Sequence, residues 1–490
     1  MTDPSALCDE IDRLCAQLQL DAARQAEKWQ DWAIRPGFVA SAENLAAYLA
    51  LRRYDLRATQ RELMALGLSS LGRLESRVLP TLHAVRAALA AFAGREKWAK
   101  PDEGAFFAGE KELAARTRAL FGDISTDRVA SLLVTCPSEA AEDGSFMLSL
   151  AEKGVEAVRI NCAHDDADKW ARMIEHVHAA GERTGRRMRI FMDLAGPKVR
   201  TGEFCALHHD KRVQIDDLIA LVAPGKLDRP GKKDAAFAVE CTLTEALDAS
   251  KPGDRLSIDD GKAEARIERV EDDFVIARVT RCDAEGYKLK SEKGLNFPDA
   301  ELAIPALTAK DREDLRFVAA HADAIDFSFV QSVEDIELLQ ARLAEIRPDD
   351  WRTIPLVLKI ETPRAVRHLP DLIVRAAARQ PMAVMIARGD LAIEIGFTRL
   401  AEMQEEILWI GEAARIPVIW ATQVMENLVK TGAFSRGEMT DAAMAARAEC
   451  VMLNKGPHLI KAIGEIDRLI GRMDAHFHKK TPQMRRLTSW

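Results

Sequence analysis

The chain has 490 residues, of which 48% are hydrophobic and 30% charged, a composition typical of a soluble globular protein with about three domains. Its net charge of −8 argues against general nucleic-acid binding, because a phosphate backbone requires clustered Lys and Arg. The eight cysteines include no C-x-x-C pair, and we find no apolar targeting segment and no run of about 18 apolar residues. We therefore expect a cytoplasmic protein with reduced thiols, no membrane span and no nucleic-acid partner.

Helical periodicity dominates the first hundred residues. Apolar residues recur at three- and four-residue steps in 7–18 and in 74–89. A stretch rich in Gly and charge, 94–110, is typical of a connector. We predict an all-α extension over 1–120, and its residues indicate no chemistry. Covering the rest of the protein, homo-oligomerisation and partner binding are all open roles for it.

From about residue 129, short apolar runs alternate with longer amphipathic stretches such as 398–415. The runs are nearly continuous in hydrophobicity, as expected of parallel strands that are buried on both faces. They are 129–135, 155–161, 188–194, 323–329, 354–361, 382–387, 416–422 and 450–454. Eight such units at steps of roughly 30 residues predict an α/β protein built on a (β/α)8 TIM barrel.

One step between neighbouring runs is much longer than the others. The excess lies near 203–290 and holds short β-rich pieces bounded by Pro and Gly. We therefore assign 121–202 and 291–478 to the catalytic barrel, and 203–290 to an inserted small β-barrel domain. Because the insertion follows the carboxyl end of the third strand, we expect it over the barrel mouth, where active sites lie, as a lid.

Charged residues end two neighbouring strands of the predicted barrel. Lys359 and Glu361 are two apart in VLKIE, so both side chains point to the same side. Asp390 follows the next run, so its carboxylate can converge with that of Glu361. Two hard oxygen ligands, completed by water and substrate oxygens, suit Mg²⁺, and a lysine beside them suits a phosphoryl group. The alternative is a structural salt bridge of Lys359 with Glu361 or Asp390.

Polar residues follow other strands as well, which favours a functional site at this end of the barrel. They are Arg159 and Asn161 on the second run, Asp193 on the third with Lys198 and Arg200 soon after it, and Thr422 and Gln423 after the seventh.

These residues stand in motifs that resemble the pyruvate kinase family over about residues 125 to 475. In the family's order, the motifs are VEAVRINCAH, MDLAGPKVRTG, LSIDDG, SEKGLNFP, LTAKDREDLRF, DFSFV, LKIET, MIARGDLAIEI, PVIWATQVMENLVKTGAFSRGEMTDAA and ECVML. The family transfers the phosphoryl group of phosphoenolpyruvate to ADP in glycolysis, giving pyruvate and ATP. The resemblance implies that activity for this chain.

The resemblance also implies which residues act at the reacting phosphate. Glu361 and Asp390 would hold Mg²⁺ or Mn²⁺. Lys359 would stabilise the phosphoryl group during transfer, where catalysis is mostly positioning and charge neutralisation. Arg159 would bind the phosphate of the substrate.

Further positions match the family's contacts to the rest of the substrates. Gly389 and Asp390, with the hydroxyl of Thr422, would bind the substrate carboxylate, and Thr422 would also serve proton delivery to the enolate. The positions that match nucleotide contacts are Asn161, His164, Arg200 and Lys293. For His164 taken alone, an ordinary surface histidine is the competing interpretation.

Three positions depart from the pattern of members that require K⁺. Those members bind K⁺ partly through a Ser and a Thr, and here these residues are Ala163 and Leu194. They carry a Glu where this chain has Lys198. The ammonium group of a lysine can supply the monovalent charge, so we predict that K⁺ is not required.

The end of the chain departs as well. The family reads MLSGET after the last strand, whereas this chain reads MLNKGPH, with Asn454, Lys455, Gly456 and Pro457 in the changed stretch. The sequence does not indicate whether this change lowers activity. The residues after Leu453 fit one closing helix, about 459–477, and leave no room for the family's usual effector domain. We therefore expect no regulation of that kind.

Three hypotheses follow. The first is an active pyruvate kinase. The second is a metal-dependent lyase or aldolase acting on a pyruvate enolate, which would share Glu361 and Asp390 but would not need Arg200, Lys293 or the lid. The third is a non-catalytic regulator, supported mainly by the changed 454–457 stretch. The joint presence of the predicted catalytic and metal-binding residues favours the first.

Overall fold

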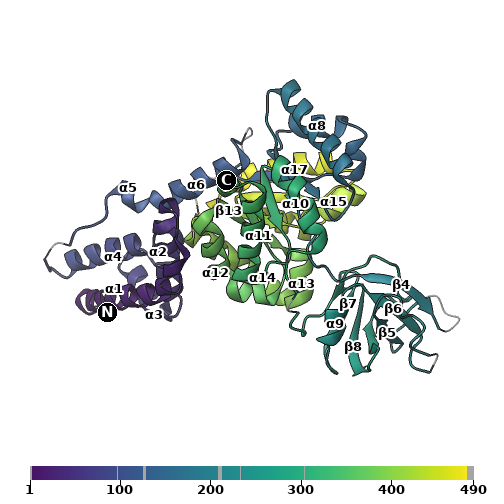
Figure 1. Cartoon of the computed structure of the whole chain (residues 1–490). Coiled ribbons are helices and arrows are strands. Elements are labelled where there is room, and N and C mark those ends of the chain that lie inside the picture. The colour runs from purple at the N-terminus through teal and green to yellow at the C-terminus, as the bar shows by residue number, and fades with distance from the viewer. Residues whose placement is uncertain are drawn as a thin grey trace.

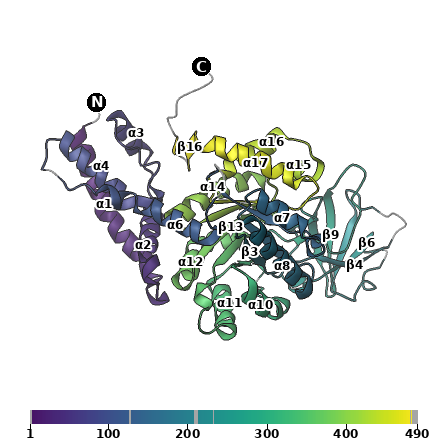
Figure 2. The ribbon, with the colours of Figure 1, turned by 90° about the horizontal axis from the view of Figure 1, so that it is seen from above.

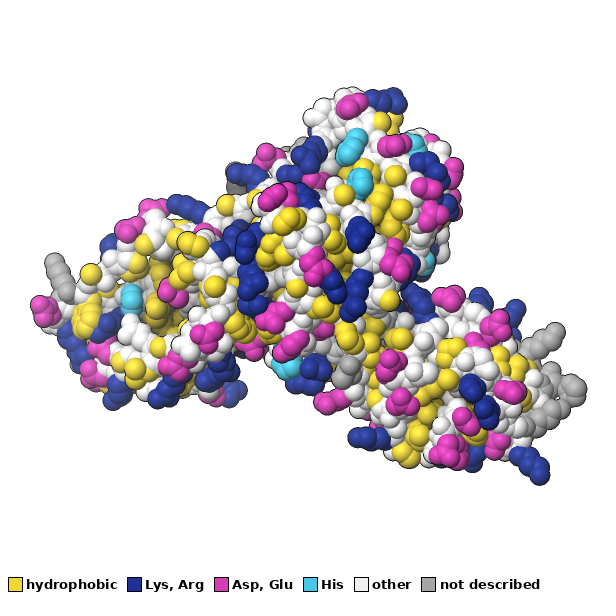
Figure 3. Space-filling view, viewed as in Figure 1, with side chains coloured by type: hydrophobic (Ala, Val, Ile, Leu, Met, Phe, Trp, Pro, Cys, Tyr) yellow, Lys and Arg dark blue, Asp and Glu magenta, His cyan; other side chains and the backbone are white. Residues whose placement is uncertain are grey.

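The computed structural model describes residues 3–96, 98–124, 128–207, 212–231, 233–302, 304–479 and 481–482. Figure 1 shows three parts, namely N-terminal helices, a central barrel and a separate sheet. The helices and the sheet lie on opposite sides of the barrel in both ribbon views (Figures 1 and 2). Acidic and basic side chains are interspersed over all three parts on the face drawn in Figure 3. Within the described residues, no helix is long and apolar enough to cross a membrane.

The central barrel is closed and parallel, in the order β1-β15-β14-β13-β12-β11-β3-β2. Its strands are β1 (Ser131–Thr135), β2 (Ala157–Asn161), β3 (Arg189–Asp193), β11 (Ala324–Phe327), β12 (Leu356–Ile360), β13 (Met382–Ala387), β14 (Val418–Ala421) and β15 (Cys450–Leu453). Nearly every strand residue is buried, because helices cover the outside and side chains fill the inside. The predicted TIM barrel is confirmed, and each strand falls within one of the predicted runs.

Helices follow the strands and form the outer layer. They are α7 (Ser145–Glu152), α8 (Ala167–Thr184), α10 (Ala309–His321), α11 (Val333–Ile346), α12 (Pro363–Arg379), α13 (Arg388–Ile395), α14 (Phe397–Ala413), α15 (Glu426–Thr431), α16 (Arg436–Ala445) and α17 (Leu459–Asp474). Local sequence sets several of their starts. Thr308 and Ser332 each cap a helix in a reciprocal capping box, and Thr362 caps α12 directly before Pro363.

The second sheet is inserted between β3 and α10, as the long step between the third and fourth runs predicted. Its order is β10-β7-β8-β9-β5-β6-β4. The strands are β4 (Thr201–Ala206), β5 (Leu218–Val222), β6 (Phe237–Cys241), β7 (Arg255–Ile258), β8 (Ala263–Val270), β9 (Phe274–Arg281) and β10 (Leu295–Asn296), with the short α9 (Thr244–Asp248). The sheet has its own apolar core, separate from that of the barrel.

The N-terminal helices dock on the barrel through buried polar contacts. They are α1 (Pro4–Glu27), α2 (Pro36–Leu51), α3 (Arg57–Ala65), α4 (Val78–Phe92), α5 (Glu103–Phe106) and α6 (Ala108–Phe121). The amide of Asn44, on α2, donates to the carbonyls of Glu75 (2.7 Å) and Ala413 (2.8 Å) and accepts from the backbone N–H of Val78 (3.0 Å). One buried side chain thus ties α2 and α4 to the end of α14.

Helix α6 closes the barrel at the end where the strands begin. Leu120 and Phe121 pack among the side chains that point into the barrel near the start of the strands. The ring of Phe121 stacks on that of Phe191, with centroids 5.5 Å apart. The sequence had indicated a connector over 94–110, but α5 and the start of α6 lie there. The Gly and charged residues of that stretch gave no helical pattern, although α5 and the first residues of α6 form there.

Phe121→Ala should lower the free energy of unfolding by about 3–5 kcal/mol, because it empties a buried aromatic site that packing cannot refill. The matched control is Phe92→Ala, whose ring is 58% exposed, against 1% for Phe121. Denaturant titration of both variants checks the expectation. Equal, small effects would show that α6 only rests against the barrel.

Candidate active site

Charged and polar side chains meet where the barrel strands end. Parallel strands bring their carboxyl ends to one mouth, and residues two apart on a strand face the same side. The structure brings together the following residues at this mouth: Arg159, Asn161, Asp193, Asp326, Ser328, Lys359, Glu361, Gly389, Asp390 and Thr422.

Asp193, at the end of β3, is the centre of this group and is 1% exposed. Its carboxylate accepts from Nε of Arg159 (2.7 Å), from Nζ of Lys359 (3.0 and 3.2 Å) and from the hydroxyl of Ser328 (2.9 Å). Burial would raise the pKa of Asp193, but Arg159 and Lys359 outweigh it and lower the pKa below its ordinary value. Asp193 therefore stays ionised and holds both cations.

Lys359 and Glu361 lie side by side on β12 and in the residue that follows it, as the strand period predicted. Nζ of Lys359 is 3.3 Å from Oε1 of Glu361, and the other carboxylate oxygen accepts from the backbone N–H of Phe329 (2.6 Å). Burial raises the pKa of Glu361, Lys359 opposes this, and the nearby Asp390 adds to the rise.

Gly389, Asp390 and Thr422 lie where α13 begins, beside the end of β14. The backbone N–H of Gly389 donates to Oγ1 of Thr422 at 2.8 Å. Thr422 and Gln423 both have left-handed backbones, with φ of 63° and 57°, an arrangement that costs energy and persists where the surroundings hold it. Arg388 provides such support, because its guanidinium donates to the Thr422 carbonyl (2.6 Å) and to Asp441 (2.9 Å).

Lys198 contacts Asp390, with Nζ 2.9 Å and 3.1 Å from the two carboxylate oxygens. The salt-bridge interpretation had paired Lys359 with Glu361 or Asp390. The structure pairs Lys359 with Glu361 and, more closely, with Asp193, while Asp390 pairs with Lys198. The charges of the mouth thus form two groups, one of Arg159, Asp193, Lys359 and Glu361 and one of Lys198 and Asp390.

The four predicted nucleotide-contacting residues fall into two groups. Asn161 and His164 line a cavity of about 320 Å³ at the mouth, together with Arg159. Arg200 and Lys293 lie where the inserted sheet joins the barrel, and Arg200 pairs in a β-bridge with Gly294. Arg200 donates to the carbonyl of Glu292 (3.1 Å), and Nζ of Lys293 is 3.6 Å from Asp259.

Two polar residues of the mouth were missed by the sequence analysis. Ser328 donates to Asp193 and accepts from Lys359 (2.6 Å). Asp326 is fully buried on β11, and among the described residues neither of its carboxylate oxygens has a hydrogen-bond partner. The signal was present, because Asp326 and Ser328 are two apart at a strand end, like Lys359 and Glu361.

The buried carboxyl of Asp326 lies 4.0 Å from Nε of Arg159. Burial first, and then the negative charge of Asp193, raise its pKa to about 8. Because this value is above neutral pH, Asp326 carries a proton in the folded protein and leaves Arg159 to Asp193.

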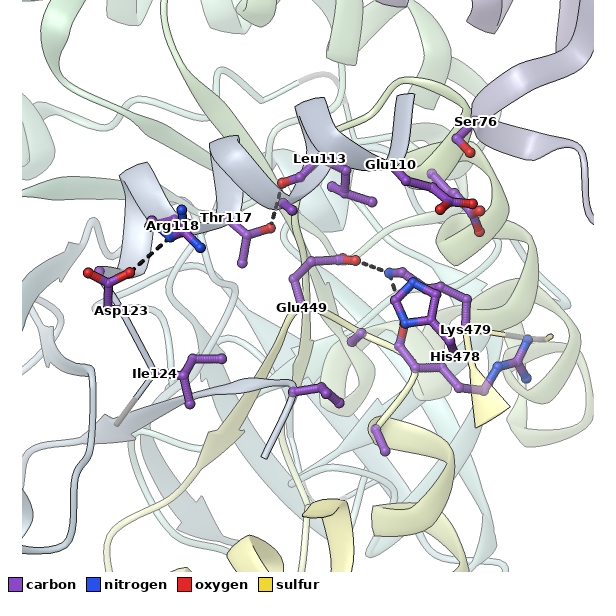
Figure 4. Close-up of a pocket in the computed structure, with 17 residues that line it drawn as sticks. Ser76, Glu110, Leu113, Thr117, Arg118, Asp123, Ile124, Glu449, His478 and Lys479 are labelled. Atoms are coloured by element: carbon purple, nitrogen blue, oxygen red, sulfur yellow. Dashed lines mark hydrogen bonds and ion pairs between the residues drawn. The ribbon is translucent and has the colours of Figure 1, made fainter. Parts of the chain in front are cut away.

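A second cavity, of about 310 Å³, lies at the opposite end of the barrel, against α6 (Figure 4). Its labelled charges are already paired. Glu449 contacts Lys479, and Nε of Arg118 is 2.9 Å from Asp123. Charges are paired at both ends of the barrel, and those of the mouth are concentrated and mostly buried. We place the reactive centre at the mouth.

The mouth carries several carboxyl groups, and those of Glu361 and Asp390 are the two that the sequence predicts as donors to a divalent ion. Within the described ranges, no group of three or more His, Cys, Asp or Glu side chains is arranged to hold a metal. Mg²⁺ and Mn²⁺ fit such a sparse oxygen donor set, because they are commonly bound through one or two carboxylates with water and substrate phosphates. The negative charge of Asp390 opposes the ionisation of Glu361, and a bound cation would relieve that repulsion.

A parallel barrel with a charged cluster at the carboxyl ends of its strands defines a barrel enzyme, since active sites of this fold lie there. The family model described as the pyruvate kinase barrel domain matches residues 128–457. The chain is 32% identical to a pyruvate kinase of Corynebacterium efficiens over 348 residues, 68% of this chain and 67% of that protein. It is 31% identical to a pyruvate kinase of Agrobacterium vitis over 363 residues, 72% of this chain and 71% of that protein. The chain belongs to the pyruvate kinase family.

The free energy of unfolding of Asp326→Asn should increase relative to that of the wild type as the pH rises from about 5 to 8. The pKa of Asp326 is about 8 in the folded protein, against an ordinary value of 3.8. At a pH between these two values, Asp326 is therefore protonated in the folded protein and ionised in the unfolded chain. Wild-type stability therefore falls with rising pH, by at most about 1.4 kcal/mol per pH unit from this group. A neutral Asn removes that slope.

Thermal unfolding of both proteins across this pH range measures the difference. Asp272→Asn, in the exposed turn between β8 and β9, is the matched control and should leave the slope unchanged. A pH-independent difference for Asp326→Asn would mean that the buried carboxyl is ionised in the folded protein.

Proposed function

We propose that this protein transfers the phosphoryl group of phosphoenolpyruvate to ADP, giving pyruvate and ATP, as a glycolytic enzyme of the cytoplasm. The observation that carries the proposal is the pair of cations, Arg159 and Lys359, held by the single carboxylate of Asp193 beside Glu361 and Asp390. Phosphoryl transfer needs little covalent chemistry from the protein. It needs fixed positive charge around the phosphoryl oxygens, which this arrangement provides.

Each proposed role follows from the position of the side chain. Arg159 binds the phosphate of the substrate, with a fork geometry suited to two oxygens. Lys359 neutralises the charge on the phosphoryl group in transfer, and its pKa is raised because Asp193 and Glu361 outweigh the effect of burial. It therefore remains a cation. Glu361 and Asp390 hold Mg²⁺ or Mn²⁺, which when bound neutralises phosphate charge.

The carboxylate of the substrate is proposed to bind at Gly389, Asp390 and Thr422. The backbone at the start of α13 offers N–H groups, which favour anions at a helix N-terminus. Oγ1 of Thr422 accepts from Gly389, so its own hydroxyl hydrogen is not used by this bond. That hydrogen is available for the proton delivery to the enolate that we propose for Thr422. Asn161, His164, Arg200 and Lys293 are proposed to bind the nucleotide.

We also propose that activity does not require K⁺. Ala163 and Leu194 have no side-chain oxygen to bind the ion, and Leu194 is 1% exposed. A fixed ammonium, that of Lys198, lies at hydrogen-bond distance from Asp390. The positive charge that K⁺ supplies in other members is supplied here by a covalently attached group.

The full-length protein, given phosphoenolpyruvate, ADP and Mg²⁺, should form pyruvate and ATP at similar rates in K⁺, in Na⁺ and in a bulky organic cation. Removal of the divalent ion should stop the reaction. A large increase in turnover on adding K⁺ would overturn the proposal for Lys198. No product under any of these conditions would overturn the proposed activity and favour a non-catalytic role.

Lys359→Met should lower turnover by at least about a hundredfold, because a fixed charge at the transferring group is lost. The salt-bridge interpretation predicts instead that the fold is lost. Lys359→Arg separates the two, since it keeps the charge but not the compact ammonium, and should fold while transferring slowly. Lys461→Met, on α17 and away from the mouth cluster, is the control. Circular dichroism and turnover are measured for all three variants.

A further inference from the structure

A third cavity, of about 300 Å³, lies at the end of the barrel where the strands begin. Its walls come from α2 and α6 of the N-terminal extension, from α12, and from the residues that lead into β12, β13 and β14. These three helices lie side by side in both ribbon views (Figures 1 and 2). The cavity shares no lining residue with the one in Figure 4 or with the one at the mouth. The barrel therefore forms this cavity only together with the extension.

Most of the side chains that line this cavity are apolar. Phe38, Ala377 and Ile416 are at most 1% exposed and form its inner wall. Ala119 and Thr353 are exposed and form its rim. A ligand that entered past this rim would gain free energy by removing its own apolar surface from water.

Two guanidinium groups also line the cavity, those of Arg35 and Arg116. Nε of Arg35 donates to the carbonyl of Ala377 at 2.9 Å. The guanidinium of Arg116 donates to the carbonyls of Gly37 (2.8 Å) and Arg415 (2.7 Å). These carbonyls are neutral, so they hold the two cations in place without compensating their charge.

The cations at this cavity outnumber the carboxylates that contact them. No acidic side chain lines the cavity, and within the described ranges Arg35 forms no ion pair. Glu112 lies 3.5 Å from Arg116, but it is shared with Arg415, which is 3.1 Å away. Buried cations are normally paired, so this arrangement leaves an excess of positive charge.

The ionisation of the two arginines reflects the same excess. Burial lowers the pKa of Arg35. Burial also lowers the pKa of Arg116, to about 10, because the charges of Arg35 and Arg415 oppose the favourable effect of Glu112. An anion in the cavity would favour the charged form of both groups.

We propose that this cavity binds a small amphipathic carboxylate, with its anionic group at Arg35 and Arg116 and its apolar part against the inner wall. The planar guanidinium matches the geometry of a carboxylate. A small inorganic anion would leave the apolar wall unused, and a neutral apolar molecule would leave the positive charge uncompensated. The inference does not depend on the proposed function, because the cavity lies at the opposite end of the barrel from the mouth.

Calorimetric titration of the full-length protein with octanoate tests the assignment. The wild type should bind octanoate, and octanoate should raise its unfolding temperature, because a ligand that binds only the folded protein stabilises it. Arg35→Met should weaken binding by about tenfold, as expected for one lost charge-assisted contact, and Arg35→Lys should retain part of the affinity. Arg118→Met is the matched control, since Arg118 is on α6 like Arg116 but lines the cavity of Figure 4, and it should bind as the wild type.

Two other compounds separate the contribution of charge from that of apolar contact. Octylamine has the same chain with the opposite charge and should not bind. Acetate has the charge without the chain and should bind at least about tenfold more weakly than octanoate. Ala119→Phe keeps both guanidinium groups but adds a ring at the rim, and it should also weaken the binding of octanoate.

The assignment would be overturned if octanoate did not bind the wild type, or bound Arg35→Met equally well. Octylamine or acetate binding as tightly as octanoate would overturn it too. Because Ala119 is exposed, Ala119→Phe should fold, and unchanged binding in this variant would reject the cavity even if Arg35→Met did not fold.

Discussion

The carboxylate of Asp193 is the interaction on which the barrel mouth depends. It is almost completely buried, and it contacts Arg159, Lys359 and Ser328 at the same time. Buried charges persist in proteins only when they are paired and hydrogen bonded. One anion therefore keeps two cations fixed and charged in a place that water hardly reaches. The cations retain donors that can face a ligand, so the site is organised before any substrate is present.

The rest of the mouth extends the same principle outward. Lys198 balances Asp390, and Phe329 supplies a backbone N–H to Glu361, so each carboxylate of the cluster has a fixed partner. Asp326 is the exception, because its burial keeps it protonated instead of paired. A carboxyl that stays neutral does not compete with Asp193 for Arg159. The electrostatic arrangement thus uses both ways in which a protein interior can accommodate an acidic group.

The sequence predicted the barrel well, because strands that are buried on both faces leave a continuous apolar signature. It also predicted that Lys359 and Glu361 point to the same side, since two residues of one strand have a fixed relative orientation, and the structure places Nζ of Lys359 3.3 Å from Oε1 of Glu361. It did not predict that Lys198 contacts Asp390, because that contact joins two distant loops whose approach only the closed barrel determines. Helix α5 and the first residues of α6 were read as a connector, because the stretch 94–110 is rich in Gly and charged residues.

The stacking of Phe121 inside the barrel has a consequence for how the chain is made. Phe121 leaves the ribosome before any strand of the barrel, yet the surface that it fills includes Phe191 and, on the last strand, Cys450. Until synthesis is nearly complete, this end of α6 has no finished surface to bury. Asn44 can form its bonds to Glu75 and Val78 early, because these residues precede the barrel, whereas its bond to the carbonyl of Ala413 has to wait for α14. The docking of α6 in the barrel is therefore completed only after the last strand has been made.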